Sequence, residues 1–436
     1  MRSPTRPAAA AESAPAPAPV LLDIARLIWS ARRTAPSGID RIELAYAQHF
    51  LDSAAGRPAY AVVHLMGWLF GVNPLGARRF VQGVAARWQG GTSQGNQVRA
   101  IGTLRLYATL LSGHWMAGFQ LRRRLKQHRR PPIFLVVSHH HLSLDYTMRG
   151  IRRSFAARCV CFLHDLIPID YPEYVKPNRQ LRHRRATQTI TRFFDAVIVN
   201  SQTTADAFRH FLSAEFGPGL RGPSISIALP GVGNFPRPDG AAKLPDGPES
   251  VPYFVVLGTI EPKKNHLLLL NLWGRLATTL ARPPRLHVIG ARGWETEQVV
   301  DMLERSHRLR GVVEEHNHLD DVAVGSLLSE ARALLVPSFV EGFGLPLAEA
   351  LASGVPVICS DIPAFREVGR DVPDYLDPLD LYAWRDAVVD YSRPDSAGRA
   401  AQMQRLAHWQ PPRWSEHFEI VERALDAAAE MPSHSP

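Results

Sequence analysis

The chain has 436 residues, of which 45% are hydrophobic, and its formal net charge is +9 at pH 7. This length predicts two or three domains of about 150 residues each, and the apolar content excludes a chain that is disordered throughout. No apolar run approaches the roughly 18 residues of a membrane-spanning helix. Prolines interrupt the N-terminal stretch, where a signal peptide needs an unbroken apolar run. We therefore expect a cytoplasmic protein without an integral membrane segment.

Residues 1–19 are almost all Ala, Pro and Ser, which predicts a disordered tail. Short β-branched runs follow it, and helical patterns separate them. The predicted strands are 20–28, 59–66, 133–138, 159–163, 196–200 and 225–229, and then 253–258, 285–290, 333–337 and 356–360. The predicted helices include 264–281, 319–331 and 414–429. This alternation predicts an α/β protein with parallel sheets that are covered by helices.

A segment rich in Gly, Pro and Asp, residues 231–252, separates the two series of strands and is typical of a linker. We therefore expect two doubly wound, Rossmann-like domains, at 20–230 and 253–412. A last helix at 413–430 is expected to cross back to the first domain. Ligands of such sheets bind beyond the carboxyl ends of the strands, so two facing domains form a cleft.

Cys159 and Cys161 alternate within the predicted strand 159–163, so both point to one face of a sheet. Two metal ligands could have this spacing, but no His or Cys cluster completes a metal site around them. We interpret both cysteines as small buried hydrophobes, and we expect no metal.

A basic run, "LRRRLKQHRR" at residues 121–130, follows Trp115, Met116 and Phe119. Arginines beside aromatic and apolar residues suit an anionic membrane surface. They also suit a solvated helix face or, less well, nucleic acid. We expect no nucleic-acid partner, and we keep the membrane surface and the solvated face as alternatives.

The stretch "EGFGLPLAEA", residues 341–350, follows a predicted strand and enters a predicted helix. Gly342 and Gly344 let the backbone approach a ligand closely. The N–H groups of Phe343, Gly344 and Leu345 then form an anion site at the start of a helix, which suits a diphosphate.

Glu341 and Glu349 flank this loop. Carboxylates accept hydrogen bonds and suit sugar hydroxyls rather than phosphate. One carboxylate on each side of a phosphate site predicts a ligand with a sugar at each end of its diphosphate, which is the shape of a nucleotide sugar.

"VLGTIEPKKNHLLLL" places Lys263 and Lys264 at the start of the predicted helix 264–281. Cations at a helix N-terminus oppose the helix dipole, which indicates an anionic partner. Ser201 precedes another predicted helix, and we interpret it as a structural N-cap.

The chain resembles the retaining glycosyltransferases of family 4, which have the GT-B fold. The resemblance extends from residue 20 onward and rests on "EGFGLPLAEALASGVPV", "GTIEPKKN" and "HLDD…ARALLVPSF". It implies that Glu341 contacts the donor sugar and Glu349 the ribose. It implies that Phe343, Gly344 and Leu345 hold the diphosphate and that Lys264 neutralises the leaving phosphate.

The resemblance also covers the first half. "PSGIDRIELAYA" is similar to the family's glycine loop, which implies that Gly38 approaches the diphosphate from the other domain. His164 matches a family histidine near the anomeric carbon. Many members carry an Arg where this chain has Thr259, so Lys263 would have to supply the second positive charge.

The implied activity is metal-independent transfer of a sugar, with retention, from a nucleotide diphosphate sugar to an acceptor hydroxyl. Similarity to bacterial mannosyltransferases favours GDP-mannose, and a lipid-linked or saccharide acceptor in surface-polysaccharide synthesis. Such an enzyme works in the cytoplasm or peripherally on the inner face of the cell membrane. Two alternatives stay open: a GT-B sugar-nucleotide epimerase and a catalytically silent GT-B scaffold.

Overall fold

The computed structural model describes residues 16–431 except 34–35, 53–55, 66–67, 90–117, 140–141, 144, 220–221, 234, 236–250 and 318. The predicted tail at 1–19 and the predicted linker at 231–252 lie largely outside the described residues. Trp115 and Met116, which precede the basic run, lie outside them too.

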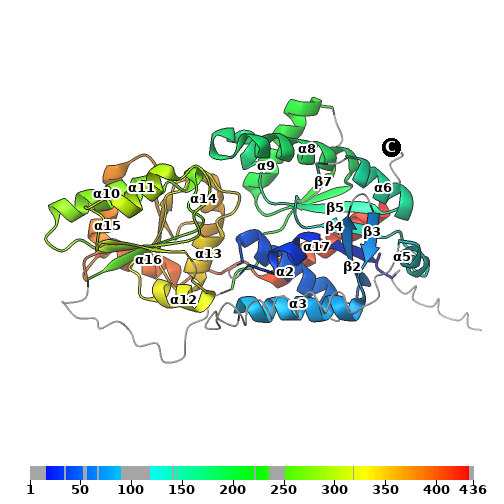
Figure 1. The fold of residues 1–436 in the computed structure, drawn as a ribbon, viewed down its shortest axis with the longest axis horizontal. Coiled ribbons are helices and arrows are strands. Elements are labelled where there is room, and N and C mark those ends of the chain that lie inside the picture. The colour runs from blue at the N-terminus through cyan, green and yellow to red at the C-terminus, as the bar shows by residue number, and fades with distance from the viewer. Residues whose placement is uncertain are drawn as a thin grey trace, which may run out of the picture.

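Two sheets form two lobes that lie side by side, with the first sheet on the right of Figure 1 and the second on the left. The first sheet has the order β3-β2-β1-β4-β5-β6-β7 and is parallel except for β3, which is antiparallel to β2. The second has the order β10-β9-β8-β11-β12-β13 and is parallel throughout. The predicted fold class, two doubly wound α/β domains, is confirmed.

The strands of the first sheet are β1 (Val20–Asp23), β2 (Ala59–Leu65), β3 (Trp68–Gly71), β4 (Ile133–Val136), β5 (Arg158–Leu163), β6 (Ala196–Val199) and β7 (Ser224–Ile227). Those of the second are β8 (Tyr253–Leu257), β9 (Arg285–Ile289), β10 (Val313–His316), β11 (Leu334–Val336), β12 (Val357–Ser360) and β13 (Asp374–Leu376). The helices around the first sheet are α1 (Ala25–Ser30), α2 (Gly38–Ala47), α3 (Pro74–Gln89), α5 (Gly118–Leu125), α6 (Asp145–Phe155), α7 (Ile167–Asp170), α8 (Pro177–Phe193) and α9 (Gln202–Phe216). The later helices are α10 (His266–Thr279), α11 (Glu297–Arg305), α12 (Asp321–Ser329), α13 (Leu345–Ala352), α14 (Pro363–Gly369), α15 (Leu381–Tyr391), α16 (Ala397–Leu406) and α17 (Trp414–Glu430).

Each sheet has a hydrophobic core on both faces, because successive strand residues point to opposite sides. Leu22 of β1 belongs to one core of the first sheet and its neighbour Leu21 to the other. Cys159 and Cys161 are both buried in a single core, so the interpretation of these residues as small buried hydrophobes is confirmed.

The last helix, α17, lies against the first sheet rather than the second (Figure 1). Phe418, Val421 and Leu425 join the core that contains Tyr46 of α2. His417 of α17 and the Tyr46 hydroxyl are 2.9 Å apart, and this hydrogen bond is buried. The chain therefore ends by packing against the lobe in which it begins.

Several predicted boundaries were wrong, and three of them have a clear local reason. The strand predicted at 20–28 ends at Asp23, whose carboxylate accepts the Ala25 N–H at 2.9 Å and turns the chain into α1. The helix predicted at 264–281 begins at His266, after a single 3-10 turn at Pro262–Lys264. The strand predicted at 333–337 ends at Val336, just before Pro337, which has no N–H to donate.

Candidate functional site

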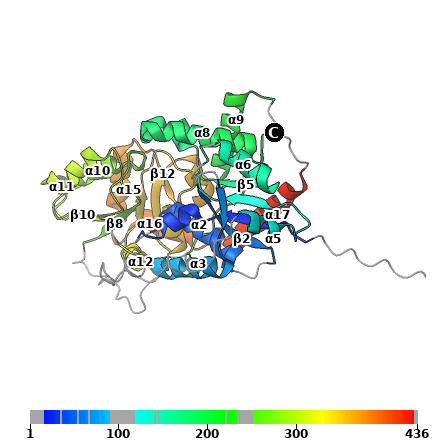
Figure 2. The ribbon, with the colours of Figure 1, turned by 45° about the vertical axis from the view of Figure 1, so that its right-hand side comes forward.

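The strand order of each sheet reverses at one point, between β1 and β4 in the first sheet and between β8 and β11 in the second. Loops at the carboxyl ends of such strands form a crevice. The loops after β8 and β11 carry Lys264 and Glu341. In the first lobe, His164 follows β5 directly and Gly38 begins α2, which follows β1 and the short helix α1. Helix α2, which begins at Gly38, lies at the junction of the two lobes in both views (Figures 1 and 2).

Glu341 is the centre of a buried cluster of charges. Its Oε1 accepts from Lys264 Nζ at 2.5 Å and its Oε2 accepts from Lys263 Nζ at 3.0 Å. Ser338 Oγ donates to the same carboxylate at 2.9 Å. Burial raises the pKa of Glu341, but the two ammonium groups outweigh burial and hold that pKa at about 2. Glu341 is therefore ionised at neutral pH.

The two lysines reach one carboxylate because they lie on the 3-10 turn before α10. We predicted that the two lysines begin the helix itself, but α10 begins two residues after Lys264, at His266. Asn265 ends the turn in the left-handed region, with φ at 55°. The Phe339 N–H donates to the Lys263 carbonyl at 2.8 Å, which ties this turn to the loop after β11. Lys263 thus places a second cation beside Lys264.

Tight contacts in the loop 341–345 require its glycines. Gly344 caps α13 with φ at 100°, and a Cβ there would lie 2.7 Å from the Phe365 ring. A Cβ on Gly342 would lie 2.6 Å from the His164 carbonyl oxygen of the first lobe. In this structure, therefore, the close approach at Gly342 is to the other domain, whereas the sequence suggested a ligand.

The same loop is hydrogen-bonded across the junction. Ser201 Oγ donates to the Gly342 carbonyl at 2.6 Å, and it also accepts from Thr204 N as the N-cap of α9. The predicted capping role of Ser201 is confirmed, and the contact to Gly342 is an additional role that sequence alone did not indicate. The ring of Tyr174 stacks on Phe339 with centroids 5.7 Å apart, so aromatic packing supports this side of the junction.

His164 lies on the first lobe beside this loop and is buried. Burial lowers the pKa of His164 to about 4, so its imidazole is neutral at pH 7. Its Nε2 lies 2.7 Å from the Val137 carbonyl oxygen, which can only accept a hydrogen bond. The proton is therefore assigned to Nε2, and Nδ1 is left as a hydrogen-bond acceptor.

Arg41 of α2 bridges the two lobes, a role that sequence reasoning left unassigned. Its guanidinium donates two hydrogen bonds to Asp321 of α12, at 2.6 and 2.9 Å, and its Nε lies 3.7 Å from Glu349. Burial raises the pKa of Glu349 to about 7, although Arg41 opposes this shift. A Cβ on Gly38, near by, would lie 2.7 Å from Leu345. A diphosphate could therefore lie between Gly38 and Leu345 only after the domains move apart.

Asp40, next to Arg41, has a structural role. It forms a capping box with Ser37 at the start of α2, and Arg26 and Arg33 pair with its buried carboxylate at 2.8 and 3.0 Å. This network fixes the loop at Gly38, from which Arg41 extends across the junction.

Within the described part of the chain, His287, Glu314 and His316 form a group whose ligand atoms lie within 4.8 Å of one another. The group is on β9 and the edge strand β10, on the other side of β8 from the point where the strand order reverses. Nδ1 of His287 and Nε2 of His316 are already hydrogen-bonded to each other, at 2.9 Å. The group is therefore not part of the cluster at Glu341. The absence of a metal at that cluster stays a prediction.

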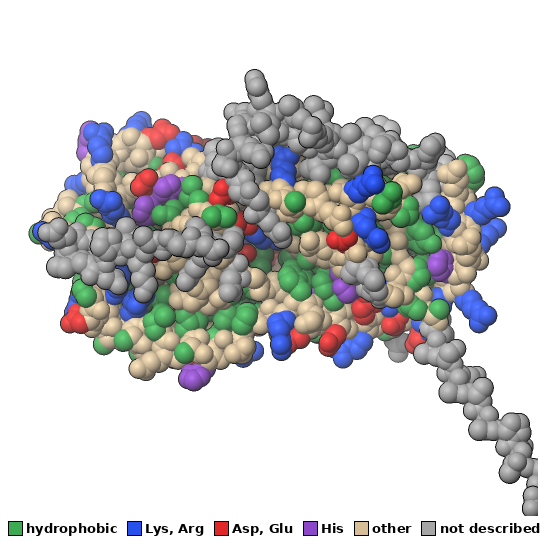
Figure 3. Space-filling view, turned by 90° about the horizontal axis from the view of Figure 1, so that it is seen from below, with side chains coloured by type: hydrophobic (Ala, Val, Ile, Leu, Met, Phe, Trp, Pro, Cys, Tyr) green, Lys and Arg blue, Asp and Glu red, His purple; other side chains and the backbone are tan. Residues whose placement is uncertain are grey.

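The basic run at 121–130 begins on α5 and continues into a turn. Arg122 lies over the Phe155 ring of α6 at 5.2 Å, and Arg130 pairs with Glu430 at 3.3 Å. Lys and Arg side chains also stand on the end of the molecule that the first lobe forms, seen from below (Figure 3). Among the described helices, none is both long and apolar enough to cross a membrane.

We predict that Arg41→Ala shifts the protein toward open arrangements of the two lobes, because charged hydrogen bonds contribute roughly 1.5–3 kcal/mol. Small-angle X-ray scattering should show a larger radius of gyration, and Asp321→Asn should have the same effect. Arg78→Ala is the matched control, since Arg78 lies near Asp52 of its own lobe. Scattering of Arg41→Ala that matches both wild type and this control would contradict the bridging role.

Two family models match the chain: "Glycosyltransferase Family 4" over residues 75–215 and "Glycosyl transferases group 1" over 245–372. The O-antigen chain mannosyltransferase B of Escherichia coli is 33% identical over 162 residues, 37% of this chain and 42% of that protein. The serotype-specific mannosyltransferase WbdA of Escherichia coli is 27% identical over 229 residues, 50% of this chain and 28% of that protein. The chain thus spans less than half the length of these relatives.

Solved structures share the fold over nearly the whole chain. Anabaena Alr3699/HepE, in complex with UDP-glucose, aligns with a TM-score of 0.60 at 15% identity, over 95% of this chain and 100% of that one. Sucrose-phosphate synthase from Thermosynechococcus elongatus aligns with a TM-score of 0.57 at 16% identity, over 94% and 100%. The chain therefore has the GT-B fold, and its first and second halves match the family 4 and the group 1 glycosyltransferase models.

Proposed function

We propose that this chain transfers mannose, with retention and without a metal, from a nucleoside diphosphate sugar to an acceptor hydroxyl. The observation that carries the proposal is the cluster of Lys263, Lys264 and Glu341 at the reversal point of the second sheet, next to His164 of the first. Two cations are gathered there beside the N-terminus of α13, where the family resemblance puts a diphosphate. The named activity of the relatives favours mannose and surface polysaccharide.

The reaction breaks the bond between the anomeric carbon and the diphosphate oxygen and forms a bond from that carbon to the acceptor oxygen. The acceptor's proton goes to the leaving diphosphate oxygen, so no protein nucleophile is required. Negative charge therefore grows on the diphosphate. Lys263, Lys264 and the N–H groups of 343–345 are placed to stabilise it, which is the usual dominant contribution of an enzyme to such a step.

Two side chains are suited to hold the sugar. Glu341 accepts hydrogen bonds only, because its carboxylate is ionised, and it is released for a sugar hydroxyl when the diphosphate takes over the lysines. His164 is neutral, and its Nδ1, which is assigned as unprotonated, offers a second acceptor. Glu349 lies one helical turn into α13, on the side where the ribose is expected.

The proposal extends to the acceptor. The relatives whose names refer to O-antigen chains favour a lipid-linked or saccharide acceptor at the inner face of the cell membrane. The basic residues of α5 suit peripheral contact with anionic lipid there.

The direct test supplies GDP-mannose, UDP-glucose and related donors with a lipid-linked saccharide and follows transfer by mass spectrometry. We expect one nucleoside diphosphate and one mannosylated product, at an unchanged rate in excess EDTA, because lysines take the place of a metal. Loss of transfer in EDTA that manganese or magnesium restores would contradict the metal-free mechanism. A donor that is altered without any acceptor would indicate an epimerase instead.

We also predict that nucleoside diphosphate affinity depends on Glu349 ionisation. The pKa of Glu349 is about 7, so lowering the pH from 8 to 6 protonates it and removes an acceptor for the ribose hydroxyls. Over this range, the affinity of wild type should therefore fall about tenfold more than that of Glu349→Gln. The reason is that the ionised fraction of Glu349 changes by about that factor. Calorimetry at both pH values measures this ratio, in which titration of the phosphate itself cancels. A constant ratio would remove Glu349 from the nucleotide site.

A further inference from the structure

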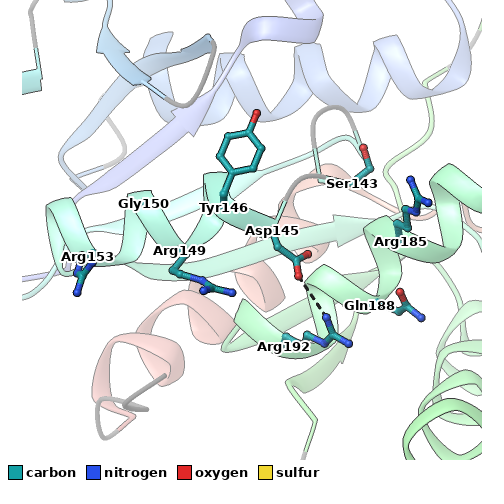
Figure 4. Close-up of a pocket in the computed structure, with 9 residues that line it drawn as sticks. All are labelled: Ser143, Asp145, Tyr146, Arg149, Gly150, Arg153, Arg185, Gln188 and Arg192. Carbon is teal, nitrogen blue, oxygen red and sulfur yellow. Dashed lines mark hydrogen bonds and ion pairs between the residues drawn. The ribbon is translucent and has the colours of Figure 1, made fainter.

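A pocket of about 660 Å³ lies between α6 and α8, outside the crevice between the lobes. Figure 4 shows its lining: Asp145, Tyr146, Arg149 and Arg153 come from α6, and Arg185, Gln188 and Arg192 come from α8. Both helices cover the face of the first sheet whose core contains Met148 and Ile190. The pocket therefore opens on the outside of the first lobe.

Helical periodicity gathers these side chains. Asp145, Arg149 and Arg153 are four residues apart on α6, so they share one face of that helix. Arg185 and Arg192 lie seven residues apart on α8 and likewise share a face. The two faces meet at the pocket, where Arg192 pairs with Asp145 at 3.2 Å (Figure 4).

The pocket holds more positive than negative charge. Four arginines and one carboxylate line it, and Asp145 already accepts hydrogen bonds from Arg192 and from Thr189. Among the residues that the structure describes, no ion pair joins Arg149, Arg153 or Arg185 to a carboxylate. Arg152, on the other side of α6, has such a partner in the buried Asp195. Like charges that line one pocket repel one another, so an anion in the pocket would be stabilising.

The surface around the pocket combines cations with exposed apolar side chains. Phe119 of α5, Tyr146 of α6 and Leu181 of α8 are 70%, 60% and 57% exposed. Helix α5 adjoins α6, as the contact of Arg122 with Phe155 shows. Each of these three helices thus carries arginines and a large exposed apolar side chain, a combination typical of the polar–apolar boundary of a membrane.

We propose that the α6–α8 pocket binds the phosphate of an anionic lipid headgroup, and that α5, α6 and α8 together form the surface that docks on the bilayer. This rests on the proposed function only in that a lipid-linked acceptor gives such docking a purpose. The planar, fork-shaped guanidinium group matches phosphate oxygens in a bidentate manner. The docking surface is therefore broader than the run at 121–130, and its phosphate site lies on two other helices.

The test is sedimentation with vesicles of phosphatidylglycerol and phosphatidylcholine at moderate salt, compared with phosphatidylcholine alone. Wild type should bind only the anionic vesicles. The triple variant Arg149→Ala, Arg153→Ala, Arg185→Ala should bind them about 100-fold more weakly, because three cations near the surface are lost. The control variant Arg305→Ala, Arg308→Ala, Arg310→Ala changes the net charge equally on exposed positions of the other lobe, and it should bind like wild type.

Arg149 lies over the Phe193 ring, so a second variant, Arg153→Ala with Arg185→Ala, preserves that contact and should still lose most of the binding. Binding by either variant that equals wild type, or wild-type indifference to anionic vesicles, would overturn the proposal. Inorganic phosphate could raise the melting temperature of wild type but not of the triple variant, while wild type binds no vesicles. That result would assign the pocket to free phosphate and would also overturn the proposal. Transfer to a water-soluble acceptor should be equal in all variants, which separates this proposal from the failure of the proposed function.

Discussion

The crevice depends on a balance of buried charge between two lysines and two glutamates. Lys263 and Lys264 share Glu341, and Lys263 also lies 3.5 Å from Glu261, so the four charges cancel. Breaking a buried pair by removing one partner typically costs about 3–5 kcal/mol, because the other charge is left uncompensated. Under the proposed function, the diphosphate replaces Glu341 as the partner of the lysines. The same step would release Glu341 to contact the rest of the ligand.

The loop that carries Glu341 also carries the contacts between the lobes. Gly342 lies against the His164 carbonyl and accepts a hydrogen bond from Ser201, both of the first lobe. Arg41 joins the lobes a short distance away, through Asp321 and Glu349. The proposed ligand site and the contacts between the lobes thus share the same few residues. A ligand that displaces Glu341, or that competes with Arg41 for Glu349, would change the relative position of the lobes as it binds.

The sequence predicted the central strands well, because strands covered on both faces read as continuous apolar runs. It missed β3, β10 and β13, which lie at sheet edges or are only three residues long. The β10 sequence, "VEEH", has no apolar run at all. Boundaries such as the end of β1 were missed because a single side-chain hydrogen bond, from Ala25 N to Asp23, decides them.

The sequence predicted individual residues of the candidate site, but not which of them are in contact with one another. The capping role of Ser201 is local in sequence and was found. Lys264 and Glu341 are 77 residues apart and Arg41 and Asp321 are 280 apart, so no sequence pattern shows that each pair is in contact. The arginines of the α6–α8 pocket were missed for the same reason: they are spread over two helices, whereas the run at 121–130 is contiguous.

The central claim is that Glu341 is the counter-ion that a diphosphate displaces. Calorimetry of Glu341→Gln with a nucleoside diphosphate tests it most directly, with Ser338→Ala as the control that removes one hydrogen bond and no charge. Glu341→Gln should bind at least tenfold more tightly than wild type, because the diphosphate no longer has to replace a charged hydrogen-bond partner that contributes roughly 1.5–3 kcal/mol. Equal or weaker binding by a folded Glu341→Gln protein would contradict it.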